Sequence, residues 1–148
     1  MKKTLSALLF LFLILSACRK NSTQSSDAVG SWKLIEVYDK TTNTPILPPT
    51  SSNIDVVITF LSSKTFAGHT LRNSISDGTY EQNGTEITFK GFSMTKIAED
   101  QWGGSFLSVL TACSLQSAAP CAPSVISLQG NMMTIHTSVR YDVILQKI

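Results

Sequence analysis

The amino-acid sequence predicts an α+β fold, made mainly of antiparallel β-sheet with one short helix. Most of residues 29–148 alternates between apolar and polar positions, which is the pattern of half-buried strands. Two pairs of these segments flank turns that contain glycine and asparagine, as antiparallel hairpins require. One segment between the hairpins instead spaces its apolar residues like the buried face of a helix.

The first expected strand is "VGSWKLIEVYD", residues 29–39, which is rich in β-branched and aromatic residues. Alternation puts Trp32 and Leu34 on one face and Val37 on the other. Residues 41–53 then hold three of the five prolines and many turn-forming residues, so we expect a loop there.

Three further strands are expected outside the hairpins. Residues 54–63 form one, and residues 64–71 continue the sheet through Gly68, where a bend or bulge is expected. The last strand is expected at residues 140–148, with one face made by Tyr141, Val143 and Leu145.

The two hairpins carry the clearest local signals. "GTYEQNGTEITF", residues 78–89, turns at the Asn-Gly pair 83–84, because both residue types tolerate a positive φ. The second hairpin, residues 125–137, turns at the Gly-Asn pair 130–131.

The helix is expected within "EDQWGGSFLSVLTA", residues 99–112. Glu99 and Asp100 lie near its start, where negative charge interacts favourably with the helix dipole. Gly103 and Gly104 weaken the helix by about 1 kcal/mol each. The apolar stripe that predicts the helix consists of Trp102, Phe106, Val109 and Leu110.

Residues 1–17 have the features of an export signal. Two lysines precede an apolar run, residues 5–15, that is too short to span a bilayer comfortably. The sequence Leu-Ser-Ala-Cys that follows resembles the bacterial lipoprotein box, in which small residues precede an obligatory cysteine. The resemblance implies that the peptide is cut before Cys18, which receives a diacylglycerol and an acylated amine. The alternative is an ordinary secretory signal followed by a chance cysteine.

A lipid on Cys18 would make residues 18–28 a membrane tether. Each buried methylene contributes about 0.8 kcal/mol, so several acyl chains anchor a protein stably. The tether is polar and poor in large apolar groups, which suits a flexible linker. Arg19 and Lys20 stand where acidic residues commonly flag retention or surface export, so we expect the periplasmic face of the outer membrane.

The charge balance argues against a nucleic-acid partner. The chain has 12 Lys and Arg against 10 Asp and Glu, and removal of residues 1–17 takes away two lysines. The remainder is close to neutral and has no basic patch. Residues 29–148 have a suitable length for one domain, which can bury about two-thirds of its unfolded surface.

Cys113 and Cys121 remain once Cys18 carries lipid. In an oxidising compartment an even pair is expected to form a disulfide. Closure of the short loop "CSLQSAAPC" would contribute about 2.5 kcal/mol on the chain-entropy model. A metal pair is the alternative, but no histidine or second cysteine pair lies nearby in the sequence to complete a site.

The order of elements over residues 29–148 resembles the META domain, the family of heat-shock protein HslJ. The threonine segment "TKIAE", the helix and the closing strand "YDVILQK" match, together with Gly30, Ser31, Trp32, Phe66, Gly68, Asn73, Gly78 and Tyr80. The resemblance implies a β-rich envelope domain, often lipid-anchored, with no agreed enzymatic activity and no known cofactor. Arg72 and Glu99 stand where the family often has cysteines, so any role of those cysteines is absent.

The runner-up is a lipocalin-like domain. "GSWKLIEV" resembles the Gly-x-Trp opening of that family equally well. A lipocalin barrel would imply an apolar ligand cavity. The helix between strands favours the META domain, because lipocalins place their helix after the barrel strands.

No catalytic set can be assembled from the sequence. It lacks a nucleophile elbow, an H-E-x-x-H motif, a P-loop and a G-x-G-x-x-G loop. Asp77 and Glu81 are the one candidate carboxylate pair for acid/base catalysis, but Asp77 followed by Gly78 is an ordinary turn sequence. We therefore expect no enzyme activity, no metal and no cofactor.

The loop "GHTLRNS" is the best candidate for binding, because His69, Arg72 and Asn73 offer polar donors beside an apolar sheet. Local hydrogen bonding is the plainer role for His69, and His136 is expected on an outward face. We expect a lipid-anchored, non-catalytic binding or envelope-maintenance module, with an envelope protein or small ligand as partner. The alternative is a lipocalin-like carrier of a small apolar ligand. A deep apolar cavity would favour the carrier, and a filled core with one polar groove would favour the module.

Overall fold

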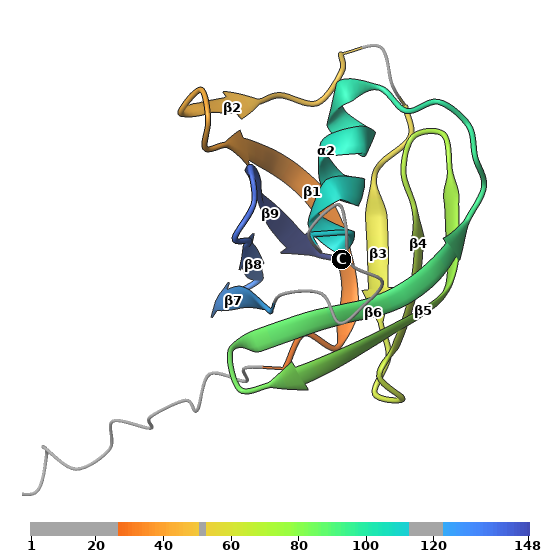
Figure 1. Cartoon of the computed structure of the whole chain (residues 1–148), viewed down its shortest axis with the longest axis vertical. Coiled ribbons are helices and arrows are strands. Elements are labelled where there is room, and N and C mark those ends of the chain that lie inside the picture. The colour runs from red at the N-terminus through yellow and green to blue at the C-terminus, as the bar shows by residue number, and fades with distance from the viewer. Residues whose placement is uncertain (1–26, 51–52, 113–122) are drawn as a thin grey trace, which may run out of the picture.

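The computed structural model describes residues 27–50, 53–112 and 123–148. Within these residues nine strands lie in one antiparallel sheet, in the order β2-β1-β3-β4-β5-β6-β7-β8-β9. β1 also pairs with β9, so eight strands close a barrel and β2 extends the sheet beside β1 (Figure 1). The predicted α+β fold, mainly antiparallel with one short helix, is confirmed.

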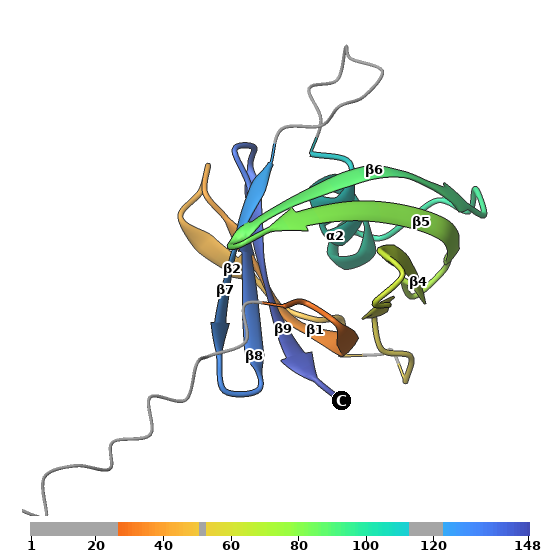
Figure 2. The ribbon, with the colours of Figure 1, turned by 90° about the horizontal axis from the view of Figure 1, so that it is seen from below.

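The helix α2 (Gln101–Leu110) lies in the chain between the first six strands and the last three. In Figure 2 it lies between the curved β5–β6 hairpin and the strands β1 and β9. The strands are β1 (Gly30–Asp39), β2 (Thr44–Ile46), β3 (Val57–Phe60), β4 (Thr65–His69), β5 (Ser74–Asn83), β6 (Glu86–Met94), β7 (Ser124–Gln129), β8 (Met132–His136) and β9 (Tyr141–Lys147).

A bulge in β1 changes which residues face the core. The ladder with β9 shifts register between Leu34 and Glu36, and such an irregularity locally breaks the alternation of faces. Val37 is therefore buried together with Trp32 and Leu34. The prediction that Val37 lies on the opposite face was wrong for this reason.

The predicted loop at residues 41–53 contains the short strand β2. Pro45 is compatible with a strand there because β2 pairs only with β1 and leaves its other edge free among the described residues. Pro45 therefore lies in an edge strand and not in a loop.

Both predicted hairpins are present. The β7–β8 turn uses Gly130 at φ +62°, as expected. In the β5–β6 hairpin the closing pair is Asn83 with Glu86, so the turn residues are Gly84 and Thr85. Gly84 alone has a positive φ, +59°, and the turn lies one residue later than predicted.

Two glycines of the family resemblance allow close packing between β3, β4 and β5. A Cβ on Gly68 would lie 2.2 Å from the carbonyl oxygen of Val57, and the predicted irregularity is present between Phe66 and Gly68. A Cβ on Gly78 would lie 2.5 Å from the ring of Phe66, its partner across the ladder. These glycines are therefore structural.

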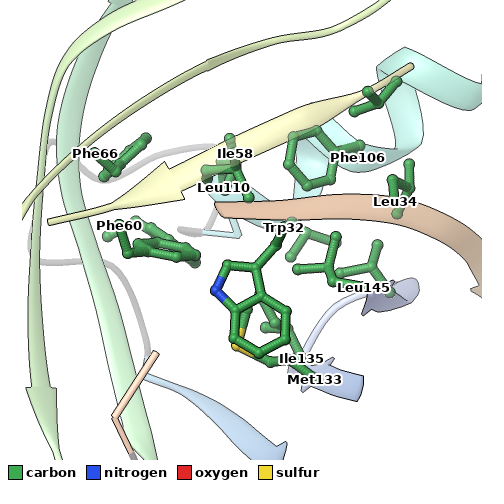
Figure 3. Packing of buried hydrophobic residues seen from close by; sticks show 14 of the residues in the cluster. Trp32, Leu34, Ile58, Phe60, Phe66, Phe106, Leu110, Met133, Ile135 and Leu145 are labelled. Atoms are coloured by element: carbon green, nitrogen blue, oxygen red, sulfur yellow. The ribbon is translucent and has the colours of Figure 1, made fainter. Parts of the chain in front are cut away.

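Side chains from the strands and α2 fill the barrel interior (Figure 3). Trp32 is 2% exposed, and its Nε1 donates a hydrogen bond of 2.7 Å to the backbone oxygen of Ala28. Tyr80 packs edge-on against Phe60, with ring centroids 5.1 Å apart, and its hydroxyl donates to the backbone oxygen of Leu61. The polar groups of these two buried aromatic side chains therefore have hydrogen-bond acceptors within the core.

An ion pair links β1 to the turn before β9. The Nε and Nη2 atoms of Arg140 donate to the buried carboxylate of Asp39 at 3.0 and 2.6 Å. This hydrogen bonding lowers the pKa of Asp39 to about 2. Beside it, the exposed His136 bonds to Asp142 at 2.9 Å, so the predicted outward position of His136 is confirmed.

Candidate functional site

The β6 strand separates from the rest of the barrel soon after its hairpin turn. It pairs with β5 as far as Met94, but its described pairing with β7 consists only of the pairs at Glu86 and Ile87. Figure 1 shows β6 running away from β7 beyond this short ladder. The space between β6 and the barrel interior is taken partly by α2.

A groove of about 660 Å³ lies between α2 and β6, and we call it the α2–β6 groove. Its volume is within the range of small-molecule sites. The lining is mainly apolar, and Met94 and Ile97 at the groove are 42% and 56% exposed. The lining residues are Phe89, Lys90, Gly91, Phe92, Met94, Ile97, Glu99, Gly104, Leu107, Ser108, Leu110 and Thr111.

Small residues keep this groove open. Gly104 and Ser108 lie one turn apart on the face of α2 that lines the groove. A Cβ on Gly104 would have only the Cβ of Glu99 nearby, at 3.7 Å, and a Cβ on Gly91 would meet nothing within 4 Å. The lining therefore has space beside Gly91 and Gly104 that a larger side chain could occupy.

The start of α2 is fixed by a side-chain cap. Asp100 has an extended backbone and accepts a hydrogen bond of 2.9 Å from the backbone N–H of Gly103. Asparagine, aspartate, serine and threonine favour this position because their side chains satisfy a free N–H of the first turn. The predicted placement of Asp100 at the helix start is confirmed.

Asn73 holds a segment that lines the groove. It is 2% exposed, and its Oδ1 accepts hydrogen bonds from the hydroxyl of Thr95 at 2.9 Å and the N–H of Ile97 at 2.8 Å. Its Nδ2 donates to the carbonyl oxygen of Ile97 at 2.8 Å. One amide side chain therefore fixes both backbone groups of a groove residue.

Glu99 connects this segment to the turn before β5 and to α2. Its Oε1 accepts hydrogen bonds from the hydroxyl of Thr70 and from Nδ2 of Asn73. Its Oε2 is buried without a hydrogen-bond partner among the described atoms and lies close to Gly103. This position at the N-terminal turn of α2 places the carboxylate at the positive end of the helix dipole.

The predicted binding loop holds a segment that lines the groove. The Nη1 atom of Arg72 donates to the carbonyl oxygen of Ala98 at 3.2 Å, and a ring nitrogen of His69 lies 3.3 Å from the carbonyl oxygen of Thr70. Arg72 and Asn73 therefore hold residues 95–99, and neither they nor His69 line the α2–β6 groove. Their direct contact with a ligand stays a prediction.

The other predicted sites are placed apart or lie outside the described residues. Asp77 is exposed and bonds to Ser76, whereas Glu81 forms an ion pair with Lys90 at 3.0 Å. No group of three His, Cys, Asp or Glu side chains in the described residues could hold a metal ion. The lipidation site Cys18 and the predicted disulfide of Cys113 with Cys121 lie outside the described residues.

Sequence reasoning did not identify the groove. Its walls come from segments of different type, and the residues that open it are the small Gly91, Gly104 and Ser108. The two helix glycines were seen only as weak helix formers. The predicted binding loop came nearest to it, because Arg72 and Asn73 bond to residues beside the groove.

The similarity of this chain to known proteins lies in its fold, because it is found with solved structures and not with sequences. No family model and no curated protein matches the sequence. The structure is similar to the NMR structure of a protein from Burkholderia xenovorans, with 16% identity, a TM-score of 0.58, and coverage of 80% of this chain and 81% of that chain. It is also similar to the crystal structure of a DUF4847 family protein from Bacteroides vulgatus, with 15% identity, a TM-score of 0.54, and coverage of 80% and 92%.

Proposed function

We propose that this chain is a non-catalytic binding module of the bacterial envelope, anchored by lipid on Cys18, whose α2–β6 groove takes an apolar group. The observation that carries the proposal is the groove itself, which is open, mainly apolar and kept free by small residues. The sequence analysis expected a polar groove for such a module, whereas the lining of this groove is mainly apolar. Its position beside a filled core departs from the interior cavity expected of a lipocalin-like carrier.

Two further observations support a binding role. Asn73 and Glu99 hold a segment of the groove lining with a network of hydrogen bonds, and a pre-formed site loses less conformational entropy when it binds. Exposed apolar side chains at the groove, Met94 and Ile97, are poorly placed for solvent and well placed for an apolar ligand.

The groove can be tested with N-phenyl-1-naphthylamine, an apolar dye that fluoresces when it leaves water. We expect saturable binding to the wild-type protein. In the Ser108→Trp variant the indole fills the groove, so we expect the affinity to fall at least about tenfold. Among the described residues, the hydroxyl of Ser108 donates to the backbone oxygen of Ser105 in its own helix and holds no other segment, so the fold should tolerate the change.

The matched control is Gln101→Trp, on the same helix but exposed and outside the groove lining. This variant should bind the dye like the wild type. Equal dye binding by all three proteins, or none by any of them, would contradict the groove as the binding site.

The anchor is tested separately by Cys18→Ser in the host cell. In the described residues no helix is long and apolar enough to cross a bilayer. We expect the variant to leave the membrane fraction and to lose the mass of the lipid. A variant that stays equally membrane-bound with unchanged mass would refute the anchor and leave the groove unaffected.

A further inference from the structure

One wall of the α2–β6 groove is a strand edge that lacks a partner in the described part of the chain. β5 pairs with one side of β6 as far as Met94, whereas β7 pairs with the other side only at Glu86 and Ile87. Alternate residues of an antiparallel strand direct their N–H and C=O groups to opposite neighbours. Several backbone donors and acceptors of residues 88–94 therefore point away from β5.

Gly91 places no side chain in the middle of this stretch. It is exposed in the middle of the unpaired stretch, and no atom lies within 4 Å of the position of a Cβ. A glycine inside a strand commonly marks a site where another backbone approaches closely. Within the described residues, this edge therefore has hydrogen-bonding groups without a strand partner, and Gly91 adds no side chain beside them.

We propose that the α2–β6 groove binds an extended peptide, which adds as a strand to residues 88–94 and directs alternate apolar side chains between β6 and α2. The added strand would continue the ladder that β7 begins at Ile87. Main-chain hydrogen bonds supply affinity in this mode of recognition, and pockets for alternate side chains supply specificity. The inference rests on the proposed function, because it names the class of ligand for the same groove.

The charges at the groove favour a peptide that carries an acidic residue. Of the two charged residues in the lining, Glu99 directs its carboxylate toward Thr70 and Asn73. Lys90 is the other, and its side chain is 33% exposed and paired with the exposed Glu81. Such an exposed pair contributes at most about 1 kcal/mol, so a peptide carboxylate can replace Glu81 as the partner.

The experiment selects random heptapeptides displayed on phage against the full chain, with the Ser108→Trp variant as the counter-selection. We expect enrichment of peptides that alternate apolar with other residues and include an acid. Synthetic versions of an enriched peptide are then N-methylated on one or the other set of alternate residues. Methylation of the set that faces β6 should weaken binding at least about tenfold, and methylation of the other set should change it less than about twofold.

Two measurements on the protein complete the test. Bound peptide should slow amide hydrogen exchange within residues 88–94. Lys90→Glu should weaken binding at least about fivefold. Lys33→Glu is the matched control, because Lys33 is similarly exposed and ion-paired, to Asp55 at 2.8 Å, but does not line the groove; this variant should bind like the wild type.

The failures are distinguishable. No enrichment, or equal loss in both methylated sets, together with retained dye binding would show that the groove takes a compact apolar molecule; this overturns the peptide and leaves the proposed function standing. Loss of both peptide and dye binding overturns both proposals. Concentration-dependent dimerisation that protects residues 88–94 without peptide would identify a second copy as the occupant and likewise overturn the inference.

Discussion

Replacement of Asn73 by alanine is expected to lower the free energy of unfolding by about 3 kcal/mol, because several hydrogen bonds of this buried amide to residues 95–99 are lost together. The N–H and C=O of Ile97 and the hydroxyl of Thr95 all bond to this side chain. Urea unfolding at neutral pH measures the loss. Because residues 95–99 are released, binding of N-phenyl-1-naphthylamine should weaken in the variant that remains folded.

Asn83→Ala is the control for this prediction. Asn83 is exposed and closes the β5–β6 hairpin through its backbone, so its replacement should change stability by less than about 0.5 kcal/mol. If Asn73→Ala had an equally small effect with unchanged dye binding, the bracing role of Asn73 would be wrong.

The adjacent glycines of α2 are expected to respond to alanine in opposite directions. Gly104→Ala should stabilise the protein by up to about 1 kcal/mol, because its Cβ meets only an ordinary contact at 3.7 Å and alanine favours the helix. Gly103→Ala should destabilise it by a net amount of about 2 kcal/mol, because its Cβ would lie 2.2 Å from Oε2 of Glu99. This net figure already includes the favourable helix propensity of alanine. Thermal or urea unfolding of both variants measures the difference.

A double variant identifies the cause. In a Glu99→Ala background the clash partner of Gly103 is gone, so Gly103→Ala should cost much less than in the wild type. An unchanged cost in that background would assign the effect to another neighbour, such as Thr70, whose Cβ lies 3.3 Å from the same position.

Local signals in the sequence predicted most of the fold. The hairpin turn at Gly130, the capped helix after Asp100 and the irregularity at Gly68 each follow from the chemistry of a few neighbouring residues. The face of Val37 could not be predicted, because the bulge in β1 depends on its pairing with β9, far away in the sequence. Closure of the sheet into a barrel depends on the same distant pairing.

The candidate site was predicted only in part. Asn73 was predicted to be either a polar donor for a ligand or a residue with a local hydrogen bond, whereas the fold buries it and uses its whole amide to hold Ile97, 24 residues away. Local sequence cannot show which polar residue a distant segment will cover. The groove residues Gly91 and Ser108 are ordinary in their own segments and acquire a role only when α2 lies beside β6.

The ladder between β1 and β9 also constrains how this chain reaches its fold. The ion pair at this closure joins residues 101 positions apart in the sequence. The pairing of β1 on this side therefore cannot form until β9 is available. Pairings of such high sequence separation form slowly, because the loop entropy is lost before the contacts compensate for it. Until β9 arrives, β1 and β8 both present open edges that invite pairing between chains. The folding chain is therefore most prone to aggregation while its seven-residue strand β9 is still unpaired.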